Sequence, residues 1–302
     1  MDKKKIGLFL LFAFGISWIS AGVLFLLGIK YGSTTSTVCV ATLYMCAPAI
    51  AAIIVQKYFY KQPIKEMGLK LKEAKGWKFF WIPVFYLLLC FLFLGIVALF
   101  GNGLQIYGFG AITFKAEDVL ANINGFTSAT GGPTLSKMPL PPIVLFITQI
   151  VSSFLIGVII NTIFTLGEEL GWRGFLYNET KQMGFWKSNL LIGIIWGLWH
   201  APLILQGHNY PDYPVAGVFM MVVFCVPLGY IMAYLRAKTN SVLAPALFHA
   251  SINAIAGNLM MYTKGGNSLI GSPPGLSGGI ACILIVLLIL VFDRKSIKLS
   301  SL

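Results

Sequence analysis

Residues 79–100 read FFWIPVFYLLLCFLFLGIVALF, an unbroken apolar run without a charged side chain. An α-helix rises about 1.5 Å per residue, so about 20 such residues cross the hydrocarbon core of a bilayer. The rest of the chain has the same character, since 57% of its 302 residues are hydrophobic and only 11% are charged. A soluble domain carries about 25% charged residues, so this composition indicates a membrane protein.

Seven further apolar runs predict membrane-spanning helices of the same kind. Pro48 and Pro227 interrupt two of them, which a membrane helix tolerates where neighbouring helices satisfy the freed backbone groups. The first run follows three lysines but is longer than a signal-peptide core and lacks an A-x-A-like cleavage site, so we expect a retained helix. We therefore predict a single membrane domain over residues 1–302, an all-α polytopic bundle of about eight transmembrane helices. The predicted spans are 6–28, 38–55, 79–100, 142–166, 189–205, 215–235, 243–261 and 279–292.

Basic residues between the apolar runs set the predicted orientation. The net charge of +12 would indicate a nucleic-acid partner in a soluble protein, but membrane orientation explains it better here. If the N-terminus is cytoplasmic, 18 of the 22 Lys and Arg residues fall in cytoplasmic segments and four fall outside. This bias follows the positive-inside rule and predicts that both termini are cytoplasmic. The most basic segment, residues 56–78, fits either an interfacial segment on anionic lipid or a solvated loop.

Four ionisable residues fall within or at the end of predicted spans. Such a side chain costs about 2.5–3.5 kcal/mol on insertion scales, which makes each one a functional candidate. Glu168 and Glu169 lie at the cytoplasmic end of the fourth span, and His200 and His249 lie within the fifth and seventh. The helical rise puts His249 about 9 Å and His200 about 16 Å from the cytoplasmic ends of their helices. Three segments therefore bring carboxylate and imidazole groups into the cytoplasmic half of the bilayer.

Helical spacing separates the roles of the two glutamates. Glu169 and Arg173 are four residues apart, so they share a helix face and can form an ion pair. Glu168 points about 100° away from Glu169 and is the freer carboxylate, which favours it as a general base. The alternative is a helix-end ion pair with a spare glutamate.

Two further pairs have the same spacing of four residues. His249 and Asn253 share one face, and the Asn253 amide could orient the imidazole, hold a water or donate to an oxyanion. An interhelical polar contact is the alternative for this pair. Trp196 and His200 pair likewise, and the tryptophan would pack beside the imidazole and help to exclude lipid and water. His208 falls in the following short loop, where we expect a solvated side chain.

This set of side chains matches the needs of amide hydrolysis. The reaction requires an activated water, a proton donor for the leaving nitrogen and stabilisation of the oxyanion. Glu168, His200, His249 and Asn253 can supply all three. Alternatively, His200 and His249 together with Glu168 could bind Zn²⁺ with one open coordination position. The HExxH spacing of soluble metalloproteases does not occur, so a metal-free glutamate/histidine mechanism and a zinc-assisted one both stay open.

Three motifs occur in order on successive predicted spans. They are EExxxR at 168–173, [FW]xxxH at 196–200 and HxxxN at 249–253. Each is weak alone, but in this order they resemble the CAAX prenyl protease and bacteriocin-processing (CPBP) family of intramembrane proteases. The part of the chain that carries the motifs is a predicted catalytic core over residues 142–261. The resemblance implies an eight-helix bundle with a cavity open to the cytosol.

The resemblance also implies a role for each motif residue. Glu168 activates the water, while His200 and His249 place the water or bind a metal. Asn253 contributes to the site that stabilises the oxyanion. The supporting residues are Glu169, Arg173 and Trp196.

The function that the resemblance predicts is an intramembrane endopeptidase that cleaves near the cytoplasmic face of a prokaryotic cell membrane. Its expected partners are membrane lipids and a peptide or a prenylated protein C-terminus, with no nucleic acid. The alternative is a non-catalytic immunity or scaffold protein of the same fold, because intact motifs permit activity without showing it. A proton-coupled transporter would need repeated span architecture and polar groups reaching the outer side, and the sequence has neither.

Overall fold

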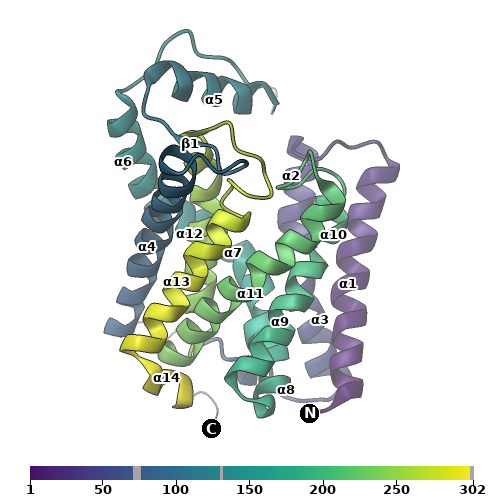
Figure 1. Cartoon of the computed structure of the whole chain (residues 1–302). Helices are drawn as coiled ribbons and strands as arrows, with labels where there is room; N and C mark the ends of the chain where they lie inside the picture. The colour runs from purple at the N-terminus through teal and green to yellow at the C-terminus, as the bar shows by residue number, and fades with distance from the viewer. Residues whose placement is uncertain (71–75, 130–131, 300–302) are drawn as a thin grey trace.

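The protein folds as a bundle of helices that run roughly side by side, as Figure 1 shows for the computed structural model. The structure describes residues 1–70, 76–129 and 132–299. Its helices are α1 (Lys3–Leu26), α2 (Thr34–Cys39), α3 (Ala47–Ile53), α4 (Trp81–Val97), α5 (Ala116–Ala129), α6 (Pro142–Ser152), α7 (Val158–Glu169), α8 (Tyr177–Thr180), α9 (Phe185–Trp199), α10 (Ala201–Ile204), α11 (Pro214–Thr239), α12 (Leu243–Met260), α13 (Leu276–Phe292) and α14 (Arg294–Leu299). One short antiparallel pair joins β1 (Ala111–Ile112) and β2 (Thr263–Lys264).

The membrane-spanning character of the bundle agrees with the sequence prediction. Five helical segments of the described chain are long and apolar enough to cross a bilayer, and the shorter apolar helix α13 adds a sixth. Two more segments, α9 with α10 and α12, overlap the predicted fifth and seventh spans. The prediction of an all-α polytopic membrane bundle is therefore confirmed. The five long segments are Lys3–Leu26, Thr34–Phe59, Trp77–Gly103, Pro142–Met183 and Pro214–Thr239.

Glycine permits close helix packing in the centre of the bundle, where α11 contacts α9, α12 and α13. A Cβ atom at Gly197 of α9 would lie 2.6 Å from the Cα of Val222 on α11. A Cβ at Gly193 would lie 2.8 Å from the Cα of Val226. Small residues let membrane helices approach this closely, which fixes the position of the α9 end that carries the WxxxH motif.

Both chain termini lie on one face of the bundle, at the bottom of Figure 1. The N-terminal amine donates to Gln182 Oε1 at 3.1 Å, and Lys5 Nζ lies 2.5 Å from Glu179 Oε1. Lys238 forms an ion pair with Asp293 near the C-terminus. An even number of spans requires this shared location, while its assignment to the cytoplasm stays a prediction. We call it the terminal face, comprising residues 1–5, 57–70, 178–188, 236–242 and 293–299.

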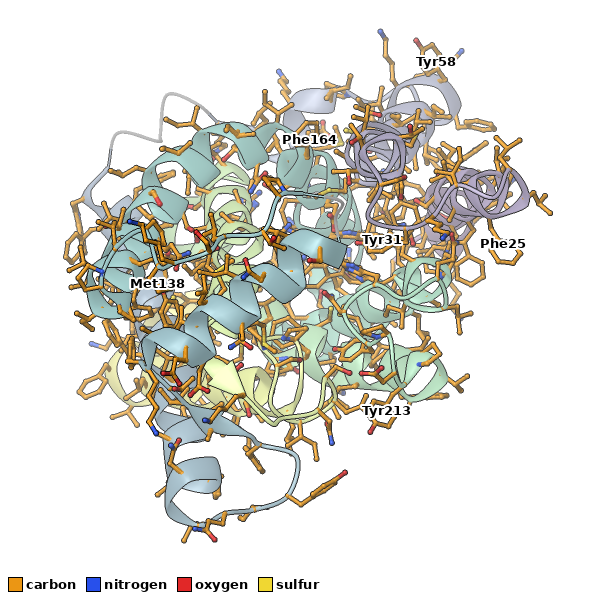
Figure 2. All side chains as sticks on the ribbon, turned by 90° about the horizontal axis from the view of Figure 1, so that it is seen from above. Phe25, Tyr31, Tyr58, Met138, Phe164 and Tyr213 are labelled. Atoms are coloured by element: carbon orange, nitrogen blue, oxygen red, sulfur yellow. The ribbon has the colours of Figure 1, made fainter. Side chains whose placement is uncertain are left out.

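The opposite face is built from loops that hydrogen-bond to one another. Lys264 Nζ lies 2.8 Å from Asp118 Oδ2 beside the β1–β2 pair. Asn122 Nδ2 donates to the carbonyl oxygens of Met261 and Thr263 at 2.9 and 2.8 Å. Helix α5 lies across this face at the top of Figure 1, and Figure 2 looks down on it. We call it the loop face, comprising residues 27–33, 102–129, 132–141, 205–213 and 261–275.

The predicted basic segment 56–78 lies on the terminal face. Its Met67 is buried, and a Cβ at Gly174 would lie 2.8 Å from the Met67 carbonyl oxygen. Lys57 and Lys65 are exposed. Residues 71–75 of the segment lie outside the described residues. The choice between an interfacial and a solvated segment therefore stays open.

Candidate active site

The helix that carries the two predicted glutamates changes its winding at the site. Helix α7 ends at Glu169, and the chain continues without a break as a π-helical segment, Leu170–Leu176. Such wider winding is rare and occurs frequently at functional sites. Gly171 lets this segment approach α3, because a Cβ there would lie 2.4 Å from Pro48 Cβ. Glu168 and Glu169 are both buried where the winding changes.

Glu169 is the centre of a buried ionic cluster. Arg173 Nη1 donates to Glu169 Oε1 at 3.0 Å, and both side chains are fully buried. His249 Nδ1 lies 3.1 Å from the same oxygen. Because a carboxylate only accepts, Nδ1 of the imidazole carries the proton, and Nε2 is the acceptor in the neutral ring. The predicted Glu169–Arg173 pair is present, and it also fixes the ring of His249.

Glu168 has a different environment from its neighbour. Trp196 Nε1 donates to Glu168 Oε2 at 2.9 Å, and Glu168 lines a cavity in the bundle. The Trp196 ring also lies 4.4 Å from the Arg173 guanidinium carbon and packs edge-on against His249, with ring centroids 5.3 Å apart. Trp196 therefore holds one oxygen of Glu168 in place, a contact that the sequence spacing did not reveal.

His200 is oriented by the end of its own helix. It directly follows α9, and its Nδ1 lies 2.8 Å from the carbonyl oxygen of Trp196. A carbonyl only accepts, so Nδ1 carries the proton here as well and Nε2 remains an acceptor. Its ring packs 5.7 Å from Trp196, as predicted, and 4.8 Å from Trp199.

The predicted catalytic residues meet in one cavity of about 630 Å³. Glu168 comes from α7, His200 from the end of α9, and His249 and Asn253 from α12. Glu168 and His249 are buried, whereas Asn253 is exposed within the opening. Helices far apart in the chain thus bring together all four side chains. Their catalytic roles remain predictions.

His208 was expected to be a solvated loop residue, and this prediction is wrong. It is half-buried in the cavity wall, with its ring stacked on His200 at a centroid distance of 6.5 Å. Its Nδ1 lies 2.5 Å from the Tyr31 hydroxyl and its Nε2 lies 3.0 Å from Asn209 Nδ2. Burial lowers the pKa of His208 to about 4. The chain folds back after α10, as the bond from the His208 N–H to the Leu203 carbonyl (3.0 Å) shows, and no periodicity in the loop signals this reversal.

A metal site does not form from the side chains as they lie. In the part of the chain that the structure describes, no three His, Cys, Asp or Glu residues are grouped so that they could hold a metal ion. Nδ1 of His249 and of His200 bond to Glu169 and to a carbonyl, which leaves Nε2 of each ring as the atom that could bind a metal. Zn²⁺ binding by Glu168, His200 and His249 stays a prediction.

The cavity leads toward the loop face. Its wall includes Tyr31, His208 and Asn209, and also Pro273 and Pro274, all from loops on that face. The family resemblance implies a cavity that opens to the cytosol, and the sequence predicts that the termini lie on that side. The observed cavity instead leads away from the terminal face. The helical rise gives the depth of a Cα atom, but it does not tell which end of a bundle is sealed by side chains.

Comparison with known proteins agrees with the motifs. Residues 145–255 match the family model described as Type II CAAX prenyl endopeptidase Rce1-like. A curated protein of Methanococcus maripaludis, CAAX prenyl protease 2, is 31% identical over 96 residues, which cover 28% of this chain and 34% of that protein. The match thus spans about a third of the relative's length. The family resemblance is confirmed over this segment, which holds every predicted site residue.

Proposed function

We propose that this protein is an intramembrane endopeptidase in which Glu168 activates the water that attacks the peptide bond. The observation that carries this proposal is the meeting of Glu168, His200, His249 and Asn253 in one cavity. The similarity to CAAX prenyl proteases covers the same helices and supports hydrolysis of a peptide bond as the reaction. Glu168 is favoured over Glu169 because Glu168 lines the cavity, whereas Glu169 is paired with Arg173 and His249.

The proposed reaction uses each group at a stated atom. Glu168 takes a proton from water as the water oxygen bonds to the peptide carbonyl carbon. The Asn253 amide N–H stabilises the charge that develops on the carbonyl oxygen, while the acceptor Nε2 atoms of His200 and His249 hold the attacking water in place. The C–N bond then breaks, and the proton held on Glu168 passes to the leaving nitrogen. Trp196 Nε1, 2.9 Å from Glu168 Oε2, keeps the second carboxylate oxygen in place throughout.

The substrate we propose is a membrane-associated peptide, with a prenylated C-terminus as one candidate. The cavity wall is mainly apolar, with residues contributed by several helices, which favours a hydrophobic ligand. Membrane lipids surround the protein, and we place it in a prokaryotic cell membrane. The apolar lining residues include Val40, Met45, Phe164, Met221, Phe224 and Ile252.

The proposal is tested with purified protein in detergent, where both faces are accessible. A farnesylated C-terminal CAAX peptide and the same peptide without the lipid are offered with and without a chelator. We expect cleavage by the wild type and by the matched control Glu117→Gln on the loop face, and none by Glu168→Ala or His249→Ala. Cleavage that survives both site substitutions contradicts the proposed site. If folded protein cleaves no peptide, the non-catalytic immunity or scaffold protein becomes the better explanation.

Chelator sensitivity separates the two mechanisms that the sequence left open. Undiminished cleavage supports the metal-free glutamate/histidine reaction. Loss of cleavage that added Zn²⁺ restores supports a metal held by His200, His249 and Glu168 in a side-chain arrangement different from the one described.

A further inference from the structure

The end of the cavity toward the terminal face is sealed by packed aromatic rings. Trp172 and Phe175, from the π-helical segment after α7, are 0% and 1% exposed, and the Trp172 ring packs 5.8 Å from Trp199 of the cavity wall. Phe9 of α1 packs against both, with ring centroids 5.6 Å from Trp172 and 4.7 Å from Phe175. The Arg173–Glu169 pair, at the start of the same helical segment, is also fully buried. A peptide therefore has no path through this layer as it is packed.

The other end of the cavity is open. Four of its lining residues are exposed: Thr37 on α2, Ile160 on α7, and Asn253 and Gly257 on α12. A Cβ at Gly257 meets no heavy atom within 4 Å, so the wall has free space at this point. The opening thus lies between α2 on one side and α7 with α12 on the other, in the half of the bundle near the loop face.

The depth of His200 agrees with entry from the loop face. Trp199 Nε1 donates to Ser17 Oγ at 2.8 Å, so the residue beside His200 is level with Ser17 of α1. By the helical rise, Ser17 lies about 21 Å from the start of α1 at Lys3 and about 14 Å from its end at Leu26. His200 is thus nearer to the loop face than to the terminal face, whereas His249 lies about 9 Å from the start of α12 on the terminal side.

Charge assigns the two faces to the two sides of the membrane. Of the 22 Lys and Arg residues, only Lys30, Lys115, Lys137 and Lys264 fall in the segments between spans on the loop-face side. The remaining basic residues belong to segments on the side of the termini, and a bias of this size marks the cytoplasmic side. The open end of the cavity therefore faces the non-cytoplasmic side.

We propose that the substrate is a membrane-anchored peptide whose scissile bond is presented on the non-cytoplasmic side of the membrane. The inference rests on the proposed endopeptidase function and changes the side from which its substrate comes. A peptide anchored by a lipid or an apolar segment in the outer leaflet can enter between α2 and α7 and place its carbonyl carbon near Glu168. A soluble cytoplasmic peptide meets the sealed layer of Phe9, Trp172 and Phe175 instead.

The route is tested by labelling introduced cysteines in the full-length protein within its membrane. Gly257→Cys and Thr37→Cys report on the cavity opening. Lys65→Cys on the terminal face serves as the matched control. In all variants the half-buried Cys39 and Cys46 are replaced by alanine. A membrane-impermeant maleimide should label the two cavity cysteines in intact cells, with loss of labelling in sealed inside-out vesicles. Lys65→Cys should behave in the opposite way. Labelling of Gly257→Cys only from the same side as Lys65→Cys overturns the proposal.

A second arm separates this inference from the proposed function. An acylated fluorogenic peptide is offered to protein in detergent, then to sealed right-side-out and inside-out vesicles. We expect cleavage in detergent and in right-side-out vesicles, with loss of cleavage in inside-out vesicles. Cleavage by inside-out vesicles alone overturns the entry route and leaves the endopeptidase intact. Failure in detergent overturns the endopeptidase, while the labelling result still decides which side the cavity faces.

Discussion

The two halves of the bundle use their polar residues in opposite ways. Toward the terminal face, Glu169 and Arg173 are fully buried and bonded to each other at 3.0 Å, and the guanidinium packs 4.4 Å from the Trp196 ring. Toward the loop face, Glu168, His200 and Asn253 face a cavity of about 630 Å³. Neighbouring residues of one helix therefore belong to different environments, one closed and one open.

The difference shows how a buried charge can support a reactive one. A buried ion pair adds little net stability over an apolar pair, but loss of one partner is costly because it strands the other charge. The Glu169–Arg173 pair is thus suited to holding a fixed geometry, and it fixes the His249 ring at 3.1 Å. Glu168 has a single Trp196 N–H on one oxygen and remains able to exchange a proton with water in the cavity.

Removing the Glu168 charge removes the proposed general base from the open cavity and has the largest expected effect on activity. Glu168→Gln should lower kcat/KM by about 10²–10⁴-fold, the usual contribution of a general base. The thermal midpoint in detergent should stay near that of the wild type, because the replacement amide keeps an oxygen for Trp196. Peptide cleavage and thermal unfolding are measured on the same preparation. Substantial residual activity shows that another group activates the water.

Disrupting the buried Glu169–Arg173 ion pair should lower the stability of the protein more than its activity. Arg173→Met removes the cation from the buried Glu169 carboxylate, which keeps only its contact with His249, and should lower the free energy of unfolding by about 3–5 kcal/mol. The double variant Arg173→Met/Glu169→Gln should recover part of this loss, because no charge is then stranded. Chemical unfolding in micelles gives both values. Equal stabilities of the wild type and Arg173→Met contradict the framework role of the pair.

Trp196 joins the two halves, so a conservative exchange should have an intermediate effect. Trp196→Phe keeps an aromatic ring between Arg173 and His249 but removes the N–H on Glu168. A hydrogen bond to a charged group is worth about 1.5–3 kcal/mol, which corresponds to a fall in kcat of about 10- to 100-fold. KM should change little if the contact positions the base rather than the substrate. A change confined to KM points to substrate binding instead.

His208 provides the smallest and most specific test. Burial lowers its pKa to about 4, so between pH about 6.5 and 4 the unfolded chain binds a proton that the folded protein does not. Stability therefore falls as the pH drops through this range. His208→Phe keeps a ring against His200 and should make the thermal midpoint less dependent on pH. An unchanged pH dependence shows that His208 is solvated.

Much of this fold can be predicted from apolar runs and from charge. Residues 79–100 and the other runs fix the helices, because in lipid only a helix of this length satisfies its own backbone. Spacing of four residues correctly paired Glu169 with Arg173 and Trp196 with His200. These relations are local along one helix, which is why the sequence alone reveals them.

The remaining features depend on contacts between distant residues. The sealed layer joins Phe9 to Trp172 and Phe175, and the His208 contacts join a loop to Tyr31. Neither follows from periodicity, so the sequence did not predict which end of the cavity is closed. Helix α5 and strand β1, between the third and fourth predicted spans, and the pairing of β1 with β2 after α12 were missed for a related reason. Their alignment rests on bonds such as that from Asn122 to Met261.

The attack of water activated by Glu168 is tested most directly by following oxygen into the product. Purified protein in excess over a peptide is allowed one turnover in water enriched in oxygen-18. The mass of the product that carries the new carboxylate is then measured by mass spectrometry. We expect one heavy oxygen in the product of the wild type and no product from Glu168→Gln. An unlabelled carboxylate from the wild type, or wild-type cleavage by Glu168→Gln, would contradict a water activated by Glu168.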